Sequence, residues 1–342
     1  WLGQIAESGY LSAKHSDQYE KWANDLGFYD VFKKGSKYKG KYYGLWKATD
    51  TRAIWVWKDV LHAAGYTMED IRSAKGLLNA LPEITETAKE EFGMSGGLEY
   101  PFNGKWVVDQ WYGWLYQLGG KILKQNEDGE WVAGFNNEAG YKSLNYVKKL
   151  KEAGATMRRT WQWNLANFMD RSYAMTYEGS WDFLTIKNEF PNLSPAEIKE
   201  KIGMIPTTVF EGEEMRVLTG GWLWTIPKTA NHPDLTFNIL TEIFADRKAY
   251  AQHLAYEAKF PTSEKLWESS LYKEKMLENM PEEWFESFQN GVEGGVWRPF
   301  FPEYPKIQKA LWDATQKVVM GKATAKKALT TAEKKVNNLM ED

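Results

Sequence analysis

Two carboxylates and a tryptophan lie close together in the stretch MTYEGSWDF, where Glu178 and Asp182 flank Trp181. The two acidic residues are four positions apart, so the start of a helix would bring them together. A glycoside hydrolase needs two carboxylates flanking one bond, about 5–5.5 Å apart if retaining and about 6.5–9.5 Å apart if inverting. Acidic residues at a helix start are also common as caps or solvated charges. A hydrolase is therefore one hypothesis, and a capping role is its alternative.

The composition excludes most other kinds of active site. The chain has no cysteine, which removes thiol catalysis, disulfides and cysteine-bound zinc. Its four histidines are scattered without ligand-like spacing, so we expect neither a metal nor another cofactor. The sequence has no nucleophile elbow, glycine-rich phosphate loop or HExxH motif. The net charge of −3 leaves no excess of positive charge for binding nucleic acid.

Aromatic residues are unusually abundant for a hydrophilic chain. The 342 residues include 18 tryptophans, 18 tyrosines and 16 phenylalanines, while the mean hydropathy is −0.57. Flat rings beside polar groups suit a carbohydrate site, because pyranose C–H faces stack on indole and polar side chains bind the hydroxyls. The pattern therefore predicts a carbohydrate-binding cleft, and the alternative is that the rings fill a core.

The segment TGGWLWTIPKTANHPD, which begins at Thr219, places two glycines directly before two tryptophans. In a strand, Trp222 and Trp224 would project to the same side. Gly220 and Gly221 have no Cβ, so they allow the backbone to bend or a ligand to approach closely. The segment predicts a hinge or cleft wall that leads into a stacking surface. An aromatic core strand with a glycine bulge is the alternative.

Trp181 is expected to open a helix just after a buried strand. The free backbone N–H groups at a helix start can bind a polar ligand beside the ring. The alternative is that Ser180 caps the helix and Trp181 simply packs.

Short apolar strands alternate with amphipathic helices, which indicates an α/β protein with mostly parallel sheets. Residues 41–59 predict two strands broken around Thr49–Arg52. One helix is predicted from a Thr67 cap and another from Pro82, and Asp128-Gly129 predicts a hairpin. Further helices are predicted at 137–154, after Ser194, on both sides of Asp246 and at 324–340, and buried strands at 173–177 and 201–206.

Seven segments follow one another in a recognisable order: WLGQIAESGYL, YKGKYYGLWKATDTRAIWVWKD, MTYEGSW, IGMIPTT, TGGWLWTIPKTANHPD, AKFPTSEKLW and RPFFPEYPKIQKAL. In this order they resemble the extracellular solute-binding proteins of ABC sugar importers, the family that includes maltose-binding protein. The resemblance covers essentially the whole chain. It is specific for the family and does not distinguish between sugars.

This resemblance implies a type II periplasmic-binding-protein fold, with two α/β lobes joined by hinge strands that close on the ligand. Lobe one would comprise 1–50 and 222–272, and lobe two 53–218 and 275–342, with hinges near 48–52, 219–223 and 272–276. Family members carry a further strand–helix–strand–helix unit ahead of WLGQIAESGYL. The sequence lacks this unit, which would add about 60–90 residues and several strands to lobe one.

The resemblance also implies a binding site. Trp181, Trp222, Asp50 and Arg52 match the family pattern, and Asp50 lies where relatives often have a hydroxyl-binding carboxylate. Further predicted site residues are Trp46, Gly221, Glu178, Trp111, Arg298 and Trp224. The alternatives are that Trp111 packs a helix and that Arg298 forms a structural ion pair.

The function implied is binding without chemistry. An oligosaccharide would bind between the lobes and be delivered to the membrane permease of an ABC importer. We expect a monomer that binds no nucleic acid and works outside the cytoplasm, in the periplasm or lipid-anchored at the outer cell surface. The alternative remains a carbohydrate-active enzyme with paired carboxylates.

Overall fold

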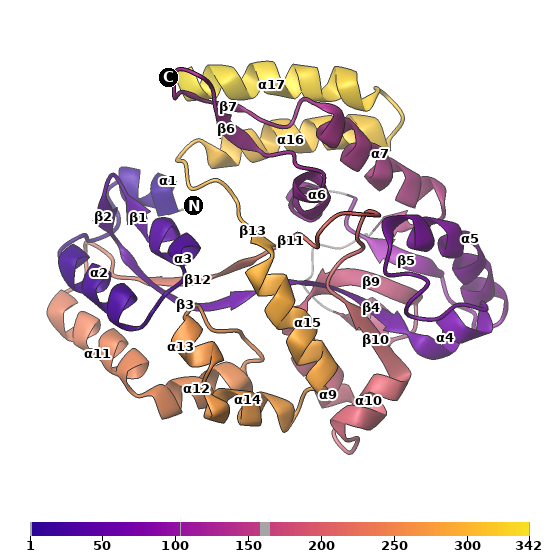
Figure 1. The fold of residues 1–342 in the computed structure, drawn as a ribbon, viewed down its shortest axis with the longest axis horizontal. Helices are drawn as coiled ribbons and strands as arrows, with labels where there is room; N and C mark the ends of the chain where they lie inside the picture. Colours follow the sequence, from indigo (N-terminus) through magenta and orange to yellow (C-terminus); the bar gives the residue numbers. More distant parts are fainter. Residues whose placement is uncertain (1, 103, 158–164, 342) are drawn as a thin grey trace. The chain divides into compact units, whose positions relative to one another are not determined.

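The computed structural model describes residues 2–102, 104–157 and 165–341, which fold into two compact units (Figure 1). Unit 1 comprises Trp1–Asp50, Gly220–Phe285 and Phe300–Tyr304, and unit 2 comprises Thr51–Thr219, Glu286–Pro299 and Pro305–Asp342. The chain therefore passes between the units at residues 50–51 and 219–220, within the first two predicted hinge segments. That these segments bend remains a prediction.

The third boundary lies later in the chain than the predicted hinge at 272–276. That position falls within helix α14 (Ser270–Leu277), and residues 275–285, expected in lobe two, belong to unit 1. The rings of Tyr272 and Phe285 both pack against Trp267, with centroids 5.8 and 5.6 Å away. Because this aromatic cluster ties the segment to unit 1, the chain leaves the unit only after Phe285.

Unit 2 is built on a five-stranded sheet with the strand order β10-β4-β9-β5-β8. Its strands are β4 (Arg52–Trp57), β5 (Gly96–Tyr100), β8 (Thr156–Met157), β9 (Tyr173–Gly179) and β10 (Ile202–Ile205). Four of them run in one direction, as predicted, while β4 is antiparallel to both of its neighbours. The reason is that β4 follows β3 (Gly44–Asp50) after the single residue Thr51, instead of arriving through a crossover helix.

Helix α5 (Ala74–Glu90) packs on β5 and replaces two helices that the sequence predicted. Thr67 does not cap it, because the Thr67 N–H and hydroxyl both donate to Asp70 Oδ2 at 2.7 Å in a separate turn. The N-cap is Ser73, whose Oγ accepts a 2.9 Å hydrogen bond from the Gly76 N–H. Pro82 lies inside the helix. One continuous buried face, which includes Leu77, Leu81 and Ile84, outweighs the cost of about 3 kcal/mol for an interior proline.

A group of helices and a hairpin completes unit 2 (Figure 1). Strand β6 (Leu123–Gln125) pairs with β7 (Trp131–Ala133) around Gly129, and α17 (Ala325–Glu341) packs on β7 and on α7 (Glu138–Glu152). These elements match the predicted hairpin and helices. The others are α4 (Lys58–Ala63), α6 (Lys105–Gln117), α8 (Ala166–Met169), η1 (Ser180–Asp182), α9 (Phe183–Glu189), α10 (Pro195–Lys201), β11 (Val217–Leu218), β13 (Gly295–Val296) and the greater part of α15 (Glu282–Glu293) and of α16 (Tyr304–Val319), both of which begin in unit 1.

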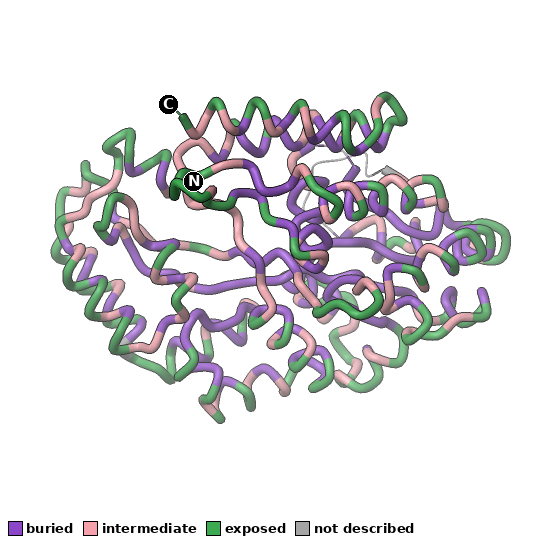
Figure 2. The backbone as a smooth tube through the Cα atoms, turned by 45° about the horizontal axis from the view of Figure 1, so that its top comes forward, coloured by how far each residue is buried: buried purple, intermediate pink, exposed green. Residues whose placement is uncertain are grey.

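Stacked aromatic rings form the core beside this sheet, whose strands are mostly buried (Figure 2). Tyr177 of β9 stacks on Tyr100 and Trp114, with centroids 5.6 and 5.8 Å away. Burial raises the pKa of Tyr177 to about 12, and its hydroxyl donates a 3.0 Å hydrogen bond to Thr207. Part of the aromatic surplus is therefore core packing.

Unit 1 contains an antiparallel pair formed by β3 and β12 (Gly220–Thr225). Its other elements are α1 (Leu2–Glu7), α2 (Ser16–Asp25), α3 (Asp30–Gly35), β1 (Lys37–Tyr38), β2 (Lys41–Tyr42), α11 (Pro233–Ala245), α12 (Arg247–Tyr256) and α13 (Glu264–Trp267). Helices α11 and α12 meet at Asp246, as predicted, because its carboxylate accepts a hydrogen bond from the Ala249 N–H and starts the second helix.

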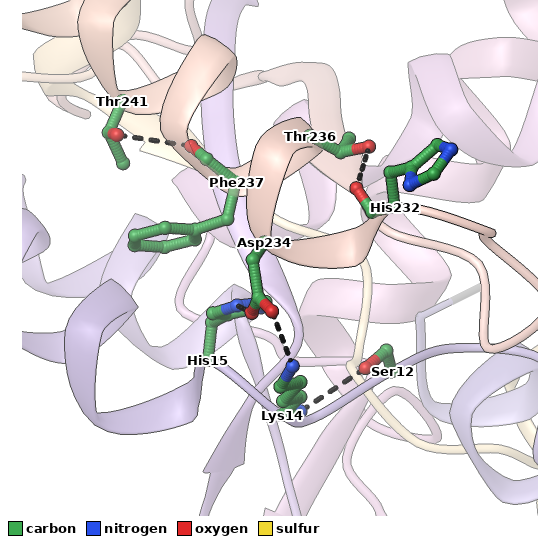
Figure 3. Close-up of polar contacts among 8 residues, drawn as sticks. All are labelled: Ser12, Lys14, His15, His232, Asp234, Thr236, Phe237 and Thr241. Atoms are coloured by element: carbon green, nitrogen blue, oxygen red, sulfur yellow. Dashed lines mark hydrogen bonds and ion pairs between the residues drawn. The ribbon is translucent and has the colours of Figure 1, made fainter.

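The first turn of α11 is held by charged groups from the segment before α2 (Figure 3). Asp234 Oδ2 accepts a 2.8 Å hydrogen bond from Lys14 Nζ, and Asp234 Oδ1 lies 2.8 Å from His15 Nε2. The His15 ring is buried and stacks on Phe237, with centroids 4.5 Å apart. The hydrogen bonds from Lys14 and His15 hold the pKa of the Asp234 carboxyl below its usual value.

This ion cluster predicts an acid-dependent contribution to stability. A carboxyl with a lowered pKa in the folded state stabilises the protein above its unfolded pKa, and the contribution disappears as the pH falls through the folded value. Asp234→Asn should therefore lower the urea midpoint at pH 7, and the difference from the parent should begin to shrink near pH 4 and disappear only as the pH falls through the lowered pKa of Asp234. Urea titrations across that range measure it. A difference that does not change with pH would contradict this assignment.

Candidate functional site

The tryptophans divide between core and surface. Trp222 and Trp131 have the largest exposed fractions among the tryptophans that the structure describes, 47% and 40%. Trp222 is thus the predicted stacking residue with the most open ring. Seven of the tryptophans in the described part of the chain are buried: Trp46, Trp55, Trp57, Trp111, Trp114, Trp267 and Trp284.

Trp222 lies on β12, opposite Ala48 of β3, and a lysine covers its ring. The Nζ atom of Lys259 is 3.8 Å from the indole centroid. Sequence reasoning did not find Lys259, which lies in the loop after α12. The loop reaches β3 because Phe260 and Thr49 exchange backbone hydrogen bonds of 3.1 and 2.9 Å. No local sequence signal reveals this contact, since it depends on tertiary pairing alone.

Gly221 serves the sheet rather than a ligand. Its φ of +151° is a conformation that other residues rarely adopt, and a Cβ there would overlap the Ala48 carbonyl oxygen. The pairing register shifts between Trp222 and Leu223, so the strand carries an irregularity next to the glycines. The segment thus has the irregularity of the alternative, an aromatic core strand with a glycine bulge, but it is not a core strand, because only Gly220 of β12 is buried.

The other two tryptophans of this ladder are engaged in packing. Trp224 is half-buried and packs edge-on against Phe244, with centroids 5.4 Å apart. Trp46 is buried and packs against Phe32 at 5.6 Å. Neither ring is open as Trp222 is.

Trp181 lies in η1 directly after β9 and is half-buried. Arg52, at the start of β4, is paired with Gly179 of β9, and its guanidinium carbon lies 4.9 Å from the Trp181 ring centroid. A Cβ at Gly179 would overlap the indole, so the glycine makes room for the ring. Arg52 was predicted as a residue of the binding site. It is only 2% exposed, and its side chain lies against Trp181.

The carboxylates around Trp181 are both buried. The Gly179 N–H donates a 3.3 Å hydrogen bond to Asp182 Oδ2, so Asp182 caps the turn, as the alternative to a hydrolase predicted. The alternative had Ser180 as the cap, but its Oγ accepts a 3.3 Å hydrogen bond from the Thr51 N–H. The turn is thereby tied to the residue that separates β3 from β4. Glu178 lies in β9.

Asp50 is the last residue of β3 and belongs to unit 1. It is buried and paired with Gly220 of β12. Its predicted role as a hydroxyl-binding carboxylate remains a prediction.

Trp111 and Arg298 have structural roles, as their alternatives stated. Trp111 is wholly buried in α6, and its Nε1 donates a 2.8 Å hydrogen bond to Ser143. Arg298 donates from Nε and a terminal nitrogen to the two oxygens of Asp109, at 3.1 and 2.8 Å. Gln308 donates a third hydrogen bond to Asp109 at 3.1 Å. The predicted ligand contacts of Trp111 and Arg298 are thus replaced by packing and by an ion pair.

The described residues contain neither a membrane-spanning helix nor a cluster of metal ligands. Within residues 2–102, 104–157 and 165–341, no helix has the length and apolar character to cross a membrane. The same residues contain no group of three or more histidine, aspartate or glutamate side chains that could hold a metal ion.

The sequence matches one family model, described as bacterial extracellular solute-binding protein, over residues 1–277. The maltodextrin-binding protein MdxE of Bacillus subtilis (strain 168) is 24% identical over 256 residues. That alignment covers 73% of this chain and 56% of MdxE, so the chain spans just over half the length of this curated relative.

Several solved structures share the fold. The GacH receptor of Streptomyces glaucescens GLA.O, solved unliganded and with acarbose, has a TM-score of 0.79 at 20% identity, over 100% of this chain and 82% of that chain. Maltose-bound MalE3 of T. maritima has a TM-score of 0.75 at 16% identity, over 99% and 82%. Lmo0181 of Listeria monocytogenes, in complex with cycloalternan, has 0.76 at 18%, over 99% and 82%. The fold is that of the two-lobed α/β periplasmic binding proteins of type II.

Proposed function

The chain belongs to the bacterial extracellular solute-binding proteins, and from this premise we propose that it binds a carbohydrate, specifically an oligosaccharide, for import by an ABC transporter. The observation that carries the proposal is the 47% exposed fraction of Trp222, held on a strand whose other tryptophan, Trp224, packs against Phe244. An open indole offers a flat apolar face that suits the C–H face of a pyranose. Structures of similar fold have maltose and cycloalternan as their named ligands.

The proposed site contains two stacking rings, Trp222 in unit 1 and Trp181 in unit 2. Asp50 and Glu178 are the proposed acceptors for sugar hydroxyls, since carboxylates accept strong hydrogen bonds from O–H donors. Trp46, Trp111, Trp224 and Arg298 are left out of the site, because each is used in packing or in an ion pair.

Ligand binding is proposed to favour a closed state through bending at 48–52 and 219–223. A ligand shifts such an equilibrium only by its difference in affinity between the two states. The saccharide is therefore proposed to bind more tightly to the closed state than to the open state. The closed form is the one proposed to be recognised by the permease.

The proposed role involves no turnover. Buried Glu178 and capping Asp182 do not resemble a free acid–base pair, and the family consists of binding proteins. We also propose that the protein is monomeric, binds no nucleic acid and works outside the cytoplasm, either in the periplasm or attached by a lipid to the outer cell surface.

A thermal-shift screen tests the proposal. The panel comprises maltotriose, acarbose, cycloalternan and mannobiose, with tagatose and glucose as the monosaccharides. A true ligand at 100 times its Kd stabilises the folded form by about 2.7 kcal/mol and raises the Tm. Prolonged incubation of each hit, followed by chromatography, separates a binder from a hydrolase. Cleaved product would contradict the proposal, as would a panel without any shift.

Replacing the open indole should weaken binding selectively. Trp222→Ala is expected to cost about 1–3 kcal/mol of binding free energy for the saccharide from the screen, through loss of the stacked ring. Isothermal titration calorimetry measures this change. The matched control is Trp131→Ala, which removes an exposed tryptophan from the β6–β7 hairpin and should leave the affinity unchanged. Equal affinities in both variants, with the fold intact, would remove Trp222 from the site.

A further inference from the structure

Each of the two proposed stacking rings has a nearly buried cation over it. Lys259 lies over Trp222 at 3.8 Å, and Arg52 lies over Trp181 at 4.9 Å. Both basic residues have small exposed fractions, 9% and 2%. The two pairs occur in different units and on unrelated elements, so one local motif does not explain both.

Backbone contacts fix Lys259 firmly. Its N–H donates to the Leu254 carbonyl at 2.9 Å, and its own carbonyl accepts a 2.8 Å hydrogen bond from the buried Tyr272 hydroxyl. The preceding residue, Ala258, has a φ of +48°, which turns the chain sharply out of α12. The following residue, Phe260, is bound to β3. The root of the lysine side chain is therefore held in place on both sides.

Arg52 is fixed by the sheet itself. It is paired with Gly179 in the β4–β9 ladder, and Trp181 follows Gly179 by two residues in the adjoining turn. The strand pairing thus sets the distance between guanidinium and indole. Cations are attracted to indole faces, most strongly where water is partly excluded.

A third lysine–tryptophan pair, Lys47 and Trp224 in unit 1, differs from these two in its distance and packing. Lys47 Nζ lies 5.8 Å from the Trp224 centroid and 2.7 Å from Glu257 Oε2. Trp224 is half-buried and packs on Phe244. A lysine near a tryptophan therefore does not by itself define the arrangement. The Lys259–Trp222 pair combines a short cation–indole distance with a ring that is still open to solvent, while the Arg52–Trp181 pair has a distance shorter than that of the Lys47–Trp224 pair, on a half-buried ring.

We propose that Lys259 is a positioning residue for ligand binding, which covers one face of Trp222 and so directs the saccharide to the opposite face, with Arg52 acting in the same way on Trp181. The inference rests on the proposed function, because it describes how that site presents its rings. The cation occupies one indole face and restrains its tilt. A sugar ring can then stack only on the face left open, and less conformational freedom is lost when it binds.

The first test needs no ligand. Acrylamide quenches the fluorescence of exposed tryptophans. The contribution of Trp222 is isolated by subtracting the fluorescence of the same protein with Trp222→Phe. Lys259→Ala should raise this quenching about twofold, because the lysine stem and ammonium no longer cover a face. Lys259→Arg should restore the parent value. Lys309→Met is the matched control, since Lys309 lies 4.9 Å from Trp312 in α16 and should not affect Trp222. Unchanged quenching in Lys259→Ala would overturn the inference.

The second test uses the saccharide that gives the largest shift in the panel above. Lys259→Ala should weaken its binding about five- to tenfold, and Lys259→Arg should return it to within about twofold of the parent. In a Trp222→Ala background, Lys259→Ala should have no further effect, because the lysine acts through the ring. Arg52→Lys, which keeps a cation behind Trp181, should also bind within about twofold of the parent.

The outcomes separate this inference from the proposed function. Tighter binding by Lys259→Ala means that lysine and sugar compete for one face, and it overturns the inference. Unchanged affinity of Lys259→Ala overturns it as well. A further loss of affinity when Lys259→Ala is added to Trp222→Ala also overturns it, because it means that Lys259 contacts the ligand directly. A panel without any hit contradicts the proposed function, while the quenching result still decides whether Lys259 covers the ring.

Discussion

Asp109→Ala should lower the free energy of unfolding by about 3–5 kcal/mol. Asp109 is 1% exposed and accepts three hydrogen bonds, two from Arg298 and one from Gln308. Removing the carboxylate leaves the Arg298 guanidinium partly buried without its bidentate partner, which costs much more than the loss of an exposed ion pair. Urea denaturation followed by circular dichroism measures the change.

Glu69→Ala is the control for this prediction. Glu69 also pairs with an arginine, Arg72, at 3.0 Å, but its side chain is largely exposed. Exposed pairs contribute only about 0–1 kcal/mol, so this variant should be close to the parent in stability. If both variants lost less than about 1 kcal/mol, Arg298 would be free for another role and would return to the list of candidate ligand contacts.

Local signals in the sequence predicted many elements of the fold. Ser194 starts α10 with a capping box, in which Glu197 donates its N–H to the serine and accepts from the Ser194 N–H. Gly129 takes a φ of +83° at the β6–β7 turn. Such signals work because each depends on hydrogen bonds between residues a few positions apart. The helix from Thr67 was mispredicted for the same reason, since the Thr67–Asp70 pair forms an isolated turn equally well.

The candidate site was harder to predict, because it depends on residues far apart in the chain. Asp109 and Arg298 are 189 positions apart, and nothing near either residue announces their pairing. Trp111 and Trp222 are the same residue type in aromatic-rich segments, yet one is sealed in α6 and the other is open. Periodicity says which side chains share a face, but not what that face meets. Lys259 was missed for the same reason, because its place beside Trp222 depends on the tertiary pairing of Phe260 with Thr49.

The two adjacent glycines show how a correct observation can have the wrong cause. The sequence predicted close approach at Gly220 and Gly221, and a close approach exists at Gly221. Its partner is the backbone of β3 rather than a ligand, because the carbonyl of Ala48 occupies the space where a Cβ would lie. The sequence shows that these residues have no side chain. Only the pairing of β12 with β3 shows that the Ala48 carbonyl occupies the space beside Gly221.

Gly221→Ala should therefore destabilise unit 1 by about 3–4 kcal/mol. About 1–3 kcal/mol comes from a φ of +151° that is essentially restricted to glycine, and the rest from overlap with the Ala48 carbonyl, which cannot move without breaking the β3–β12 ladder. Thermal and urea unfolding measure the loss. Since Trp222 follows directly, the strain should also weaken saccharide binding if the ladder shifts.

Gly212→Ala isolates the conformational part of this effect. Gly212 also has a positive φ, +79°, but nothing lies within 4 Å of a Cβ placed there. Its substitution should cost only about 1–2 kcal/mol, the penalty for a left-handed backbone with a side chain. The difference between the two variants then measures the contact between β12 and β3. Equal losses would mean that β3 yields easily to the added methyl group, so that the contact with the Ala48 carbonyl contributes little to the cost.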